Sequence, residues 1–182
     1  MHVEIIRLTS WENVKSAALA TVGKKYAGNE ITATWKKKIL LSEHSPIRAL
    51  LFEINLYNLP YYVSTHLVRH KLGVEHFVTT QRTDRTGVER SELPQGALVN
   101  HKMIINSQAL ITTSRKRLCS MADKETIKVW RKVKEKISEI EKELAECMVR
   151  ECSYRNFCPE FVSCTACDHN AEEKAILTNT KY

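Results

Sequence analysis

The stretch LLFEINLY at residues 50–57 alternates large apolar side chains with other residues over its whole length. This alternation predicts a β-strand, because successive side chains of a strand point to opposite faces. Ser45-Pro46, just before the stretch, is typical of a helix cap followed by a proline at the first helical position. Pro60, just after it, is suited to open a helix that we expect to run to His70.

Further elements lie on both sides of this strand. The apolar-rich run at residues 3–8 predicts another strand, and residues 10–28 predict a helix with a serine as its N-cap. A second helical stretch is expected over residues 35–40. Further along, residues 98–105 predict a strand that leads into a helix over residues 106–118.

The clearest helical pattern follows Asp123. Apolar side chains recur there every three or four residues and form one stripe, while Lys and Glu fill the other faces. This pattern predicts one long amphipathic helix whose apolar side packs against the protein or against another subunit. The stripe consists of Ile127, Trp130, Val133, Ile137, Ile140, Leu144 and Met148.

These elements together predict an α+β fold, a single compact domain with a mostly antiparallel sheet flanked by helices. We expect residues 1–150 to form this domain and residues 151–182 to form a cysteine-rich tail. The composition, 43% hydrophobic and 27% charged, is ordinary for a soluble fold. No apolar stretch approaches the roughly 18 residues of a spanning helix. The first residues also lack the layout of a secretory signal, so a cytoplasmic protein is expected.

The net charge of +7 predicts attraction to phosphate, whether in nucleic acid, a nucleotide, a cofactor or acidic lipid head groups. A nucleic-acid binder is expected to interleave aromatic side chains with its basic ones, and aromatic residues make up only 7% of the chain. The positions of the arginines must therefore decide between the partners.

The arginine-rich segment at residues 66–90 reads HLVRHKLGVEHFVTTQRTDRTGVER. Its later part lies in a polar region that predicts loops and strand edges, where sites are often built. On a helix, His66, Arg69 and His70 would share one face. Three interpretations are open: a solvated basic surface, a zinc site on the paired histidines, or a nucleotide or flavin site that uses guanidinium forks. The remaining histidines, expected to be structural or exposed, include His44, His76, His101 and His169.

Several short motifs follow one another between residues 69 and 117. They are Arg69-His70-Lys71, Thr80-Gln81-Arg82, Arg90-Ser91-Glu92-Leu93-Pro94, and Asn106 with Arg117. This order resembles the flavin-dependent thymidylate synthase family, which has Arg-His-Arg, hydroxyl-X-Arg and Arg-X-X-Leu-Pro, then an Asn opening a helix that carries an Arg. The resemblance covers roughly residues 40–118.

The resemblance implies reductive methylation of dUMP to dTMP. Methylenetetrahydrofolate would supply the carbon, reduced FAD the hydride, and NADPH the electrons that restore the flavin. It also implies a homotetramer with sites shared between subunits. The implied contacts to FAD are Arg69, His70, Lys71 and Asn106. The implied contacts to dUMP are Arg69, Thr80, Arg82, Arg90 and Arg117, of which Arg117 would face the uracil ring as the catalytic residue. No metal is implied in this site.

The chain departs from the family pattern mostly on the flavin and folate side. Lys71 stands where the family has Arg, which keeps the charge but not the planar fork. Only seven residues separate Arg82 from Arg90, where the family has a long helical insertion. The arginines implied for the nucleotide are kept. A pyrimidine-nucleotide-binding module with altered catalysis is therefore the alternative function.

Five of the six cysteines lie after residue 146. In a cytosolic protein we expect thiols or metal ligands rather than disulfides. A zinc or iron–sulfur site and unligated thiols both remain open interpretations. The candidate ligands are Cys152, Cys158, Cys164 and Cys167, the last two with the two-residue gap of a metal knuckle. Cys119 is expected to be a small buried hydrophobe, or else a nucleophile whose pKa is lowered by nearby arginines.

Overall fold

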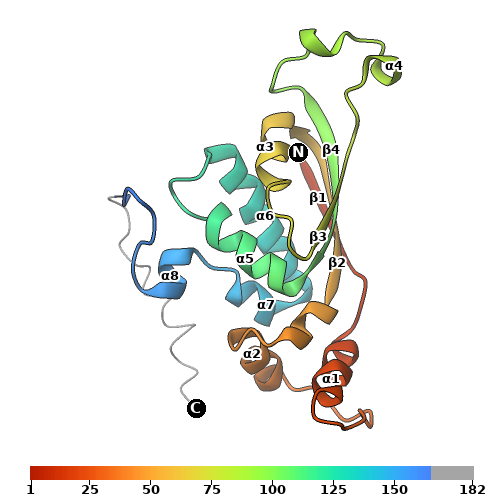
Figure 1. Ribbon diagram of the computed structural model, residues 1–182, viewed down its shortest axis with the longest axis vertical. Coiled ribbons are helices and arrows are strands. Elements are labelled where there is room, and N and C mark those ends of the chain that lie inside the picture. The colour runs from red at the N-terminus through yellow and green to blue at the C-terminus, as the bar shows by residue number, and fades with distance from the viewer. Residues whose placement is uncertain (165–182) are drawn as a thin grey trace.

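A four-stranded sheet forms the centre of the molecule, with the strand order β1-β2-β4-β3 and antiparallel pairing throughout (Figure 1). The computed structural model describes residues 1–164. The strands are β1 (His2–Arg7), β2 (Leu51–Pro60), β3 (Val74–Val78) and β4 (Leu98–Asn106). Helices lie on one face of this sheet, which confirms the predicted α+β fold with an antiparallel sheet.

Helices connect and cover the strands largely where the sequence predicts them. The first helix is shorter than expected and ends at Ala20, because the chain turns through Gly23, whose φ is 69°. The helices are α1 (Trp11–Ala20), α2 (Ala33–Leu41), η1 (Ser45–Ala49), α3 (Tyr61–Leu67), α5 (Ser107–Arg117), α6 (Lys124–Ile140), α7 (Lys142–Cys147) and α8 (Glu151–Arg155). Within residues 1–164, no helix has the length and apolar character needed to cross a membrane.

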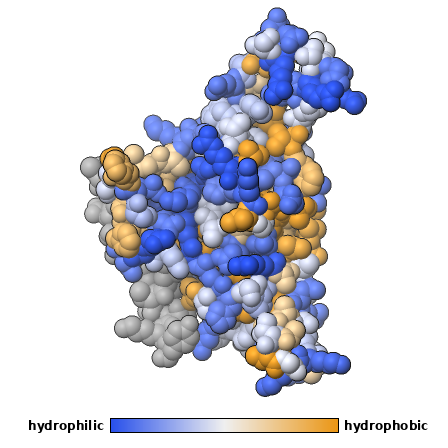
Figure 2. Space-filling model, viewed as in Figure 1, coloured by the Kyte–Doolittle hydropathy of each residue, from blue (hydrophilic) through white to orange (hydrophobic). Residues whose placement is uncertain are grey.

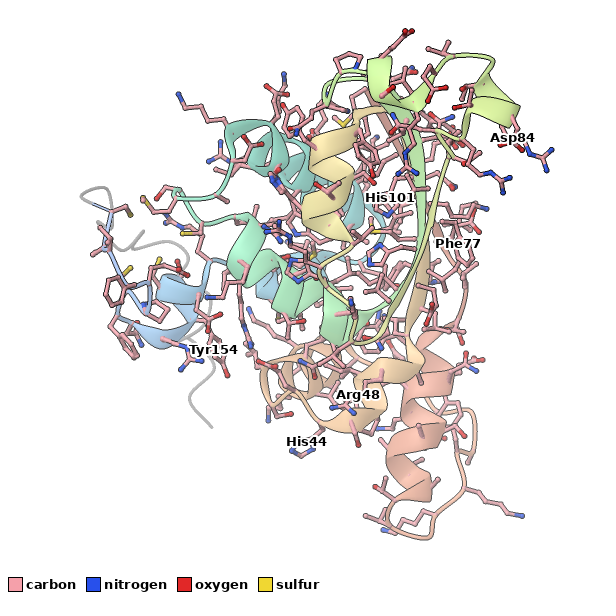
Figure 3. The ribbon with its side chains drawn as sticks, turned by 45° about the horizontal axis from the view of Figure 1, so that its top comes forward. His44, Arg48, Phe77, Asp84, His101 and Tyr154 are labelled. Atoms are coloured by element: carbon pink, nitrogen blue, oxygen red, sulfur yellow. The ribbon has the colours of Figure 1, made fainter. Side chains whose placement is uncertain are left out.

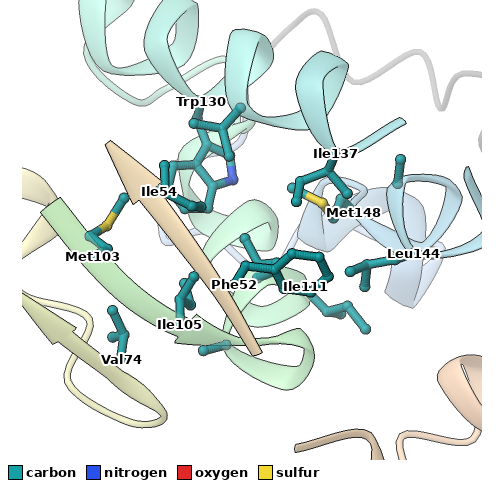
Figure 4. Packing of buried hydrophobic residues seen from close by; sticks show 14 of the residues in the cluster. Phe52, Ile54, Val74, Met103, Ile105, Ile111, Trp130, Ile137, Leu144 and Met148 are labelled. Atoms are coloured by element: carbon teal, nitrogen blue, oxygen red, sulfur yellow. The ribbon is translucent and has the colours of Figure 1, made fainter. Parts of the chain in front are cut away.

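The core lies between the sheet and the helices. Phe52, Ile54 and Leu56, the alternate residues of β2, have exposed fractions of 1% or less. They belong to one hydrophobic cluster with Trp130 and Ile137 of α6 (Figure 4). Each fully buried side chain of this size contributes about 1.5–3 kcal/mol relative to an exposed one. The alternation in the sequence therefore identified the covered face of the sheet.

The connection between β3 and β4 projects beyond the sheet as an arm, defined here as residues 79–97. It contains two short helices, α4 (Thr83–Thr86) and η2 (Arg90–Glu92), at the top of Figure 1. Hydrophilic side chains cover much of the arm in Figure 2. Its arginines are therefore displayed on the surface and contribute nothing to the core.

The amphipathic stripe after Asp123 is divided between two helices. The prediction of a single helix is wrong, because α6 ends at Ile140 and Glu141 has φ −143° and ψ 77°. Glu141 is 2% exposed. Its carboxylate accepts a hydrogen bond from Trp11 Nε1 at 2.6 Å and forms an ion pair with Arg7. The break turns this carboxylate toward β1 and α1 and keeps the second part of the stripe buried.

Glu141→Ala is expected to lower the free energy of unfolding by about 2–3 kcal/mol, because the buried Trp11 N–H and the Arg7 guanidinium lose their acceptor. Equilibrium unfolding in urea measures this change. Glu139→Ala, at an exposed position near the end of α6, is the control and should stay within about 0.5 kcal/mol of wild type. Equal stability of the two variants would contradict the role given to Glu141.

Candidate functional site

The ends of α3 and α5 meet through the side chain of Arg117. Its Nε donates to Nε2 of His70 at 2.8 Å, and its Nη2 donates to the carbonyl oxygen of His66 at 2.6 Å. Helix α3 ends at Leu67, and His70 lies in the turn beyond it. The expectation that His66 and His70 share a helical face is therefore wrong. The ring of His66 is instead directed to α6, with Nδ1 2.8 Å from Thr126 Oγ1.

Burial and the contact with Arg117 keep the His70 ring neutral. Burial, the Arg117 charge and then His76 lower the pKa of His70 from 6.5 to about 4, so the ring is neutral at neutral pH. Because Nε2 accepts the Arg117 N–H, the single ring proton must lie on Nδ1. His70 thus offers its Nδ1–H as a hydrogen-bond donor.

Two further cations lie next to His70 in the sequence. Arg69 and Lys71 are exposed on either side of His70. The pKa of Arg117 is lowered by burial and, to a smaller extent, by the charge of Arg69. The sequence Arg69-His70-Lys71 therefore forms a turn, called the basic turn below, that presents positive charge and N–H donors. Such a surface suits an anionic, planar ligand.

The far end of the basic turn is held by a close approach of backbone and side chain at Gly73. Its carbonyl oxygen accepts from Asn106 N at 3.0 Å, and its φ is 75°. A Cβ at Gly73 would lie 2.4 Å from Asn106 Nδ2, so a side chain cannot be accommodated there without moving Asn106. Asn106 Oδ1 also caps α5 by accepting from Ala109 N at 2.8 Å. The α5 helix thus contacts the turn region at both of its ends.

A chain of hydrogen-bonded polar groups, buried at Ser64 and His101 and half-buried at His76, lies behind the basic turn. From the sequence alone its histidines are expected only to be structural or exposed. His76 Nε2 is 2.7 Å from the carbonyl oxygen of His70, and His76 Nδ1 is 2.9 Å from His101 Nε2. His101 Nδ1 is 3.1 Å from Ser64 Oγ. Val74, His76 and Val78 alternate toward the helices, and Val78 pairs with His101 across β3 and β4. Only this strand register, unknown from the sequence, brings the two histidines together.

The arm carries the other residues implied for the nucleotide. Thr80, Arg82 and Arg90 are exposed there, and Arg82 forms a two-pronged ion pair with Asp84, with distances of 2.9 and 3.1 Å. Figure 3 shows Asp84 on the arm, away from α5 and α6. In the part of the chain that the structure describes, no hydrogen bond or ion pair joins these arm residues to Arg117. Within one chain, the predicted site residues therefore form two separate groups, one around Arg117 and one on the arm.

The cysteines gather partly around one small cavity. Cys119, at the end of α5, lines it together with Cys152 and Cys158. Over residues 1–164, no three or more His, Cys, Asp and Glu side chains are arranged to hold a metal ion. Cys167 lies outside the described residues, so the metal interpretation of the tail stays a prediction.

The thiols of Cys119 and Cys147 are not activated. Burial is the main cause that raises the pKa of Cys119, against the expectation that arginines would lower it. Cys147 is more deeply buried, and its pKa is raised to about 12. A thiol nucleophile at Cys119 is therefore not favoured.

The fold is that of the flavin-dependent thymidylate synthases. The chain superimposes on thymidylate synthase X from Helicobacter pylori, solved with FAD and dUMP, with a TM-score of 0.62 and 14% identity over 81% of this chain and 99% of the other. A second structure of the Helicobacter pylori enzyme with FAD and dUMP gives a TM-score of 0.63 and 12% identity, covering 81% of this chain and 100% of the other.

A related methylase has the same fold. The UMP/dUMP methylase PolB from Streptomyces cacaoi, bound with 5-Br dUMP, matches with a TM-score of 0.61 and 12% identity over 86% of this chain and 96% of the other. No protein-family model matches the sequence, and no curated protein does. At these identities the likeness shows a shared fold, and the site must be argued from its own residues.

Stability is expected to fall between pH 6.5 and 4, because the pKa values of His70 and His101 are both lowered from 6.5 to about 4. In that window the unfolded chain binds protons that the folded chain excludes, and above it both states are neutral. His101 should contribute a slope of about 1.4 kcal/mol per pH unit, and the more exposed His70 less.

Urea unfolding over this pH range measures the slope, with two variants for comparison. His101→Gln should flatten it, whereas His44→Gln, at an exposed histidine, should leave it unchanged. A slope in His101→Gln equal to that of wild type would show that His101 is not the group responsible.

Proposed function

We propose that this chain is a FAD-dependent enzyme of the thymidylate synthase type, which converts dUMP to dTMP by reductive methylation. The observation that carries the proposal is Arg117, partly buried and oriented by His70 and by the carbonyl of His66, beside two further cations. The fold shared with enzymes solved with FAD and dUMP supports it. Methylenetetrahydrofolate is the proposed carbon donor and NADPH the proposed reductant.

The donor set of the basic turn fits a flavin nucleotide. Arg69 and Lys71 supply charge for the diphosphate, and the Nδ1–H of His70 supplies a hydrogen bond to a carbonyl or ring nitrogen. Asn106 is proposed to touch the flavin next to Gly73. When bound, the reduced flavin would supply the hydride, and the protein would supply orientation and charge.

Arg117 is proposed to face the uracil ring. Two of its N–H groups are already used by His70 and His66, which holds the guanidinium in one orientation before substrate arrives. The remaining N–H groups can bond a uracil carbonyl and stabilise negative charge that develops on the ring. Partial burial strengthens this effect, because the interaction is less screened by water.

The arm residues Thr80, Arg82 and Arg90 are proposed to bind the phosphate and sugar of dUMP in the site of a neighbouring subunit. Their separation from Arg117 within one chain motivates this assignment, and so does their exposure on a projecting arm. A homotetramer with shared sites would bring the two groups together. We propose that this assembly works in the cytoplasm.

Arg117→Ala is expected to lower turnover by at least about 100-fold, because a pre-oriented donor to the transition state is lost. Formation of dTMP from dUMP measures the change, and thermal unfolding checks that the fold persists. Arg131→Ala removes the same charge from an exposed position on α6 and should keep full turnover. Activity retained by Arg117→Ala would show that its assignment is misplaced.

Sharing of the site between subunits predicts complementation. Arg117→Ala and Arg90→Ala should each be inactive, but random mixed oligomers should recover about a quarter of the wild-type sites, since some sites then combine two intact residues. Turnover of the coexpressed variants measures this recovery. No recovery in verified mixed oligomers would place both residues in the same subunit's site.

The second candidate is a pyrimidine-nucleotide-binding module without turnover. It is favoured by Lys71 in place of a planar guanidinium and by the short spacing from Arg82 to Arg90. Calorimetry separates the two functions. Tight binding of dUMP in the absence of flavin supports the module, whereas binding that requires FAD supports the synthase.

A further inference from the structure

The hydrogen-bonded chain Ser64–His101–His76 ends on the backbone of the basic turn. Its last member bonds the carbonyl oxygen of His70 at 2.7 Å. Ser64 and His101 are each 1% exposed and His76 is half-buried, so the serine cannot meet a substrate. Buried polar groups of this kind are costly unless every one has a partner.

The donor and acceptor of each hydrogen bond in this chain can be assigned by starting from the carbonyl oxygen of His70. A carbonyl oxygen can only accept, so His76 Nε2 carries a proton and donates it to His70. In neutral His76, Nδ1 must then accept from His101 Nε2. His101 Nδ1 is left as an acceptor for the Ser64 hydroxyl. Every polar atom of the chain is satisfied, and each neutral ring has one defined tautomer.

The carbonyl of His70 is one of the few fixed points of an otherwise exposed segment. Arg69 and Lys71 are exposed, and Leu72 is 90% exposed, so side-chain packing does not hold this part of the backbone. The hydrogen bond from His76 holds the backbone carbonyl of His70, while the hydrogen bond from Arg117 holds its ring. Loss of the first contact would free the ring that the second contact orients.

We propose that His76 and His101 are positioning residues, which fix the backbone of His70 so that its Nδ1–H and the Arg117 guanidinium face the bound ligand. His76 acts directly on the carbonyl of His70, and His101 supports the same tautomer of His76 by donating to its Nδ1. That the ligand is a flavin or a nucleotide rests on the proposed function, but the positioning itself does not.

The test begins with ligand-free wild-type protein labelled with ¹⁵N in its histidine rings. Two-bond ¹H–¹⁵N spectra should place the proton of His70 on Nδ1 and the protons of His76 and His101 on Nε2. His70 should also remain neutral until the pH approaches 4. A proton on Nδ1 of His76, or on Nε2 of His70 at neutral pH, would overturn the proposal whether or not any variant folds.

Two variants then separate positioning from general stability. His76→Gln keeps one N–H and one carbonyl that can replace the two ring contacts, whereas His76→Leu keeps neither. Both remove the imidazole ring, so any difference between them reports the hydrogen bonds. The pKa of His70 should rise further toward 6.5 in His76→Leu than in His76→Gln, because only the Leu variant frees the backbone of His70. Equal values in the two variants would contradict the proposal.

Flavin binding provides the functional readout. FAD affinity should fall about tenfold or more in His76→Leu and be restored in His76→Gln, with thermal unfolding followed in both. If His70 behaves as predicted but wild-type protein binds no FAD, the proposed function fails and the positioning stands. If FAD binds equally well to wild type and both variants, His76 does not position the ligand site.

Discussion

The hydrogen bonds of Arg117 tie together the parts of the molecule on which a site depends. The guanidinium reaches back from the end of α5 to the carbonyl of His66 and the ring of His70. At the start of the same helix, Asn106 closes on Gly73. The basic turn therefore runs beside α5 and is held at both ends. Its cations are displayed on a fixed backbone, which is the arrangement that recognition of a charged, planar ligand requires.

The rest of the fold supports the basic turn and Arg117 but keeps the arm residues apart from them. The sheet is covered by helices on one face, and Glu141 binds β1 and α1 to the helical layer. The arm extends in another direction and carries a second group of exposed arginines. Under the proposed function, dUMP contacts both groups at once, and the proposed oligomer brings them together.

Much of the architecture could be predicted from local patterns. The alternation in residues 50–57 identified β2 and its buried face, and the motif order from Arg69 to Arg117 indicated the fold that the superpositions show. The break at Glu141 could not be predicted, because it depends on Trp11, far away in the sequence. The hydrogen bond between His76 and His101 likewise depends on the register of β3 and β4. A single histidine in a sequence carries no such signal.

The central claim is that the basic turn and Arg117 form a flavin and pyrimidine-nucleotide site. The visible absorption spectrum of the purified protein during titration with FAD, with and without dUMP, tests it most directly. We expect a bound-flavin spectrum that changes when dUMP is added, and oxidation of the reduced flavin that depends on dUMP. No change in the flavin spectrum on mixing, together with no dUMP-dependent oxidation, would contradict it.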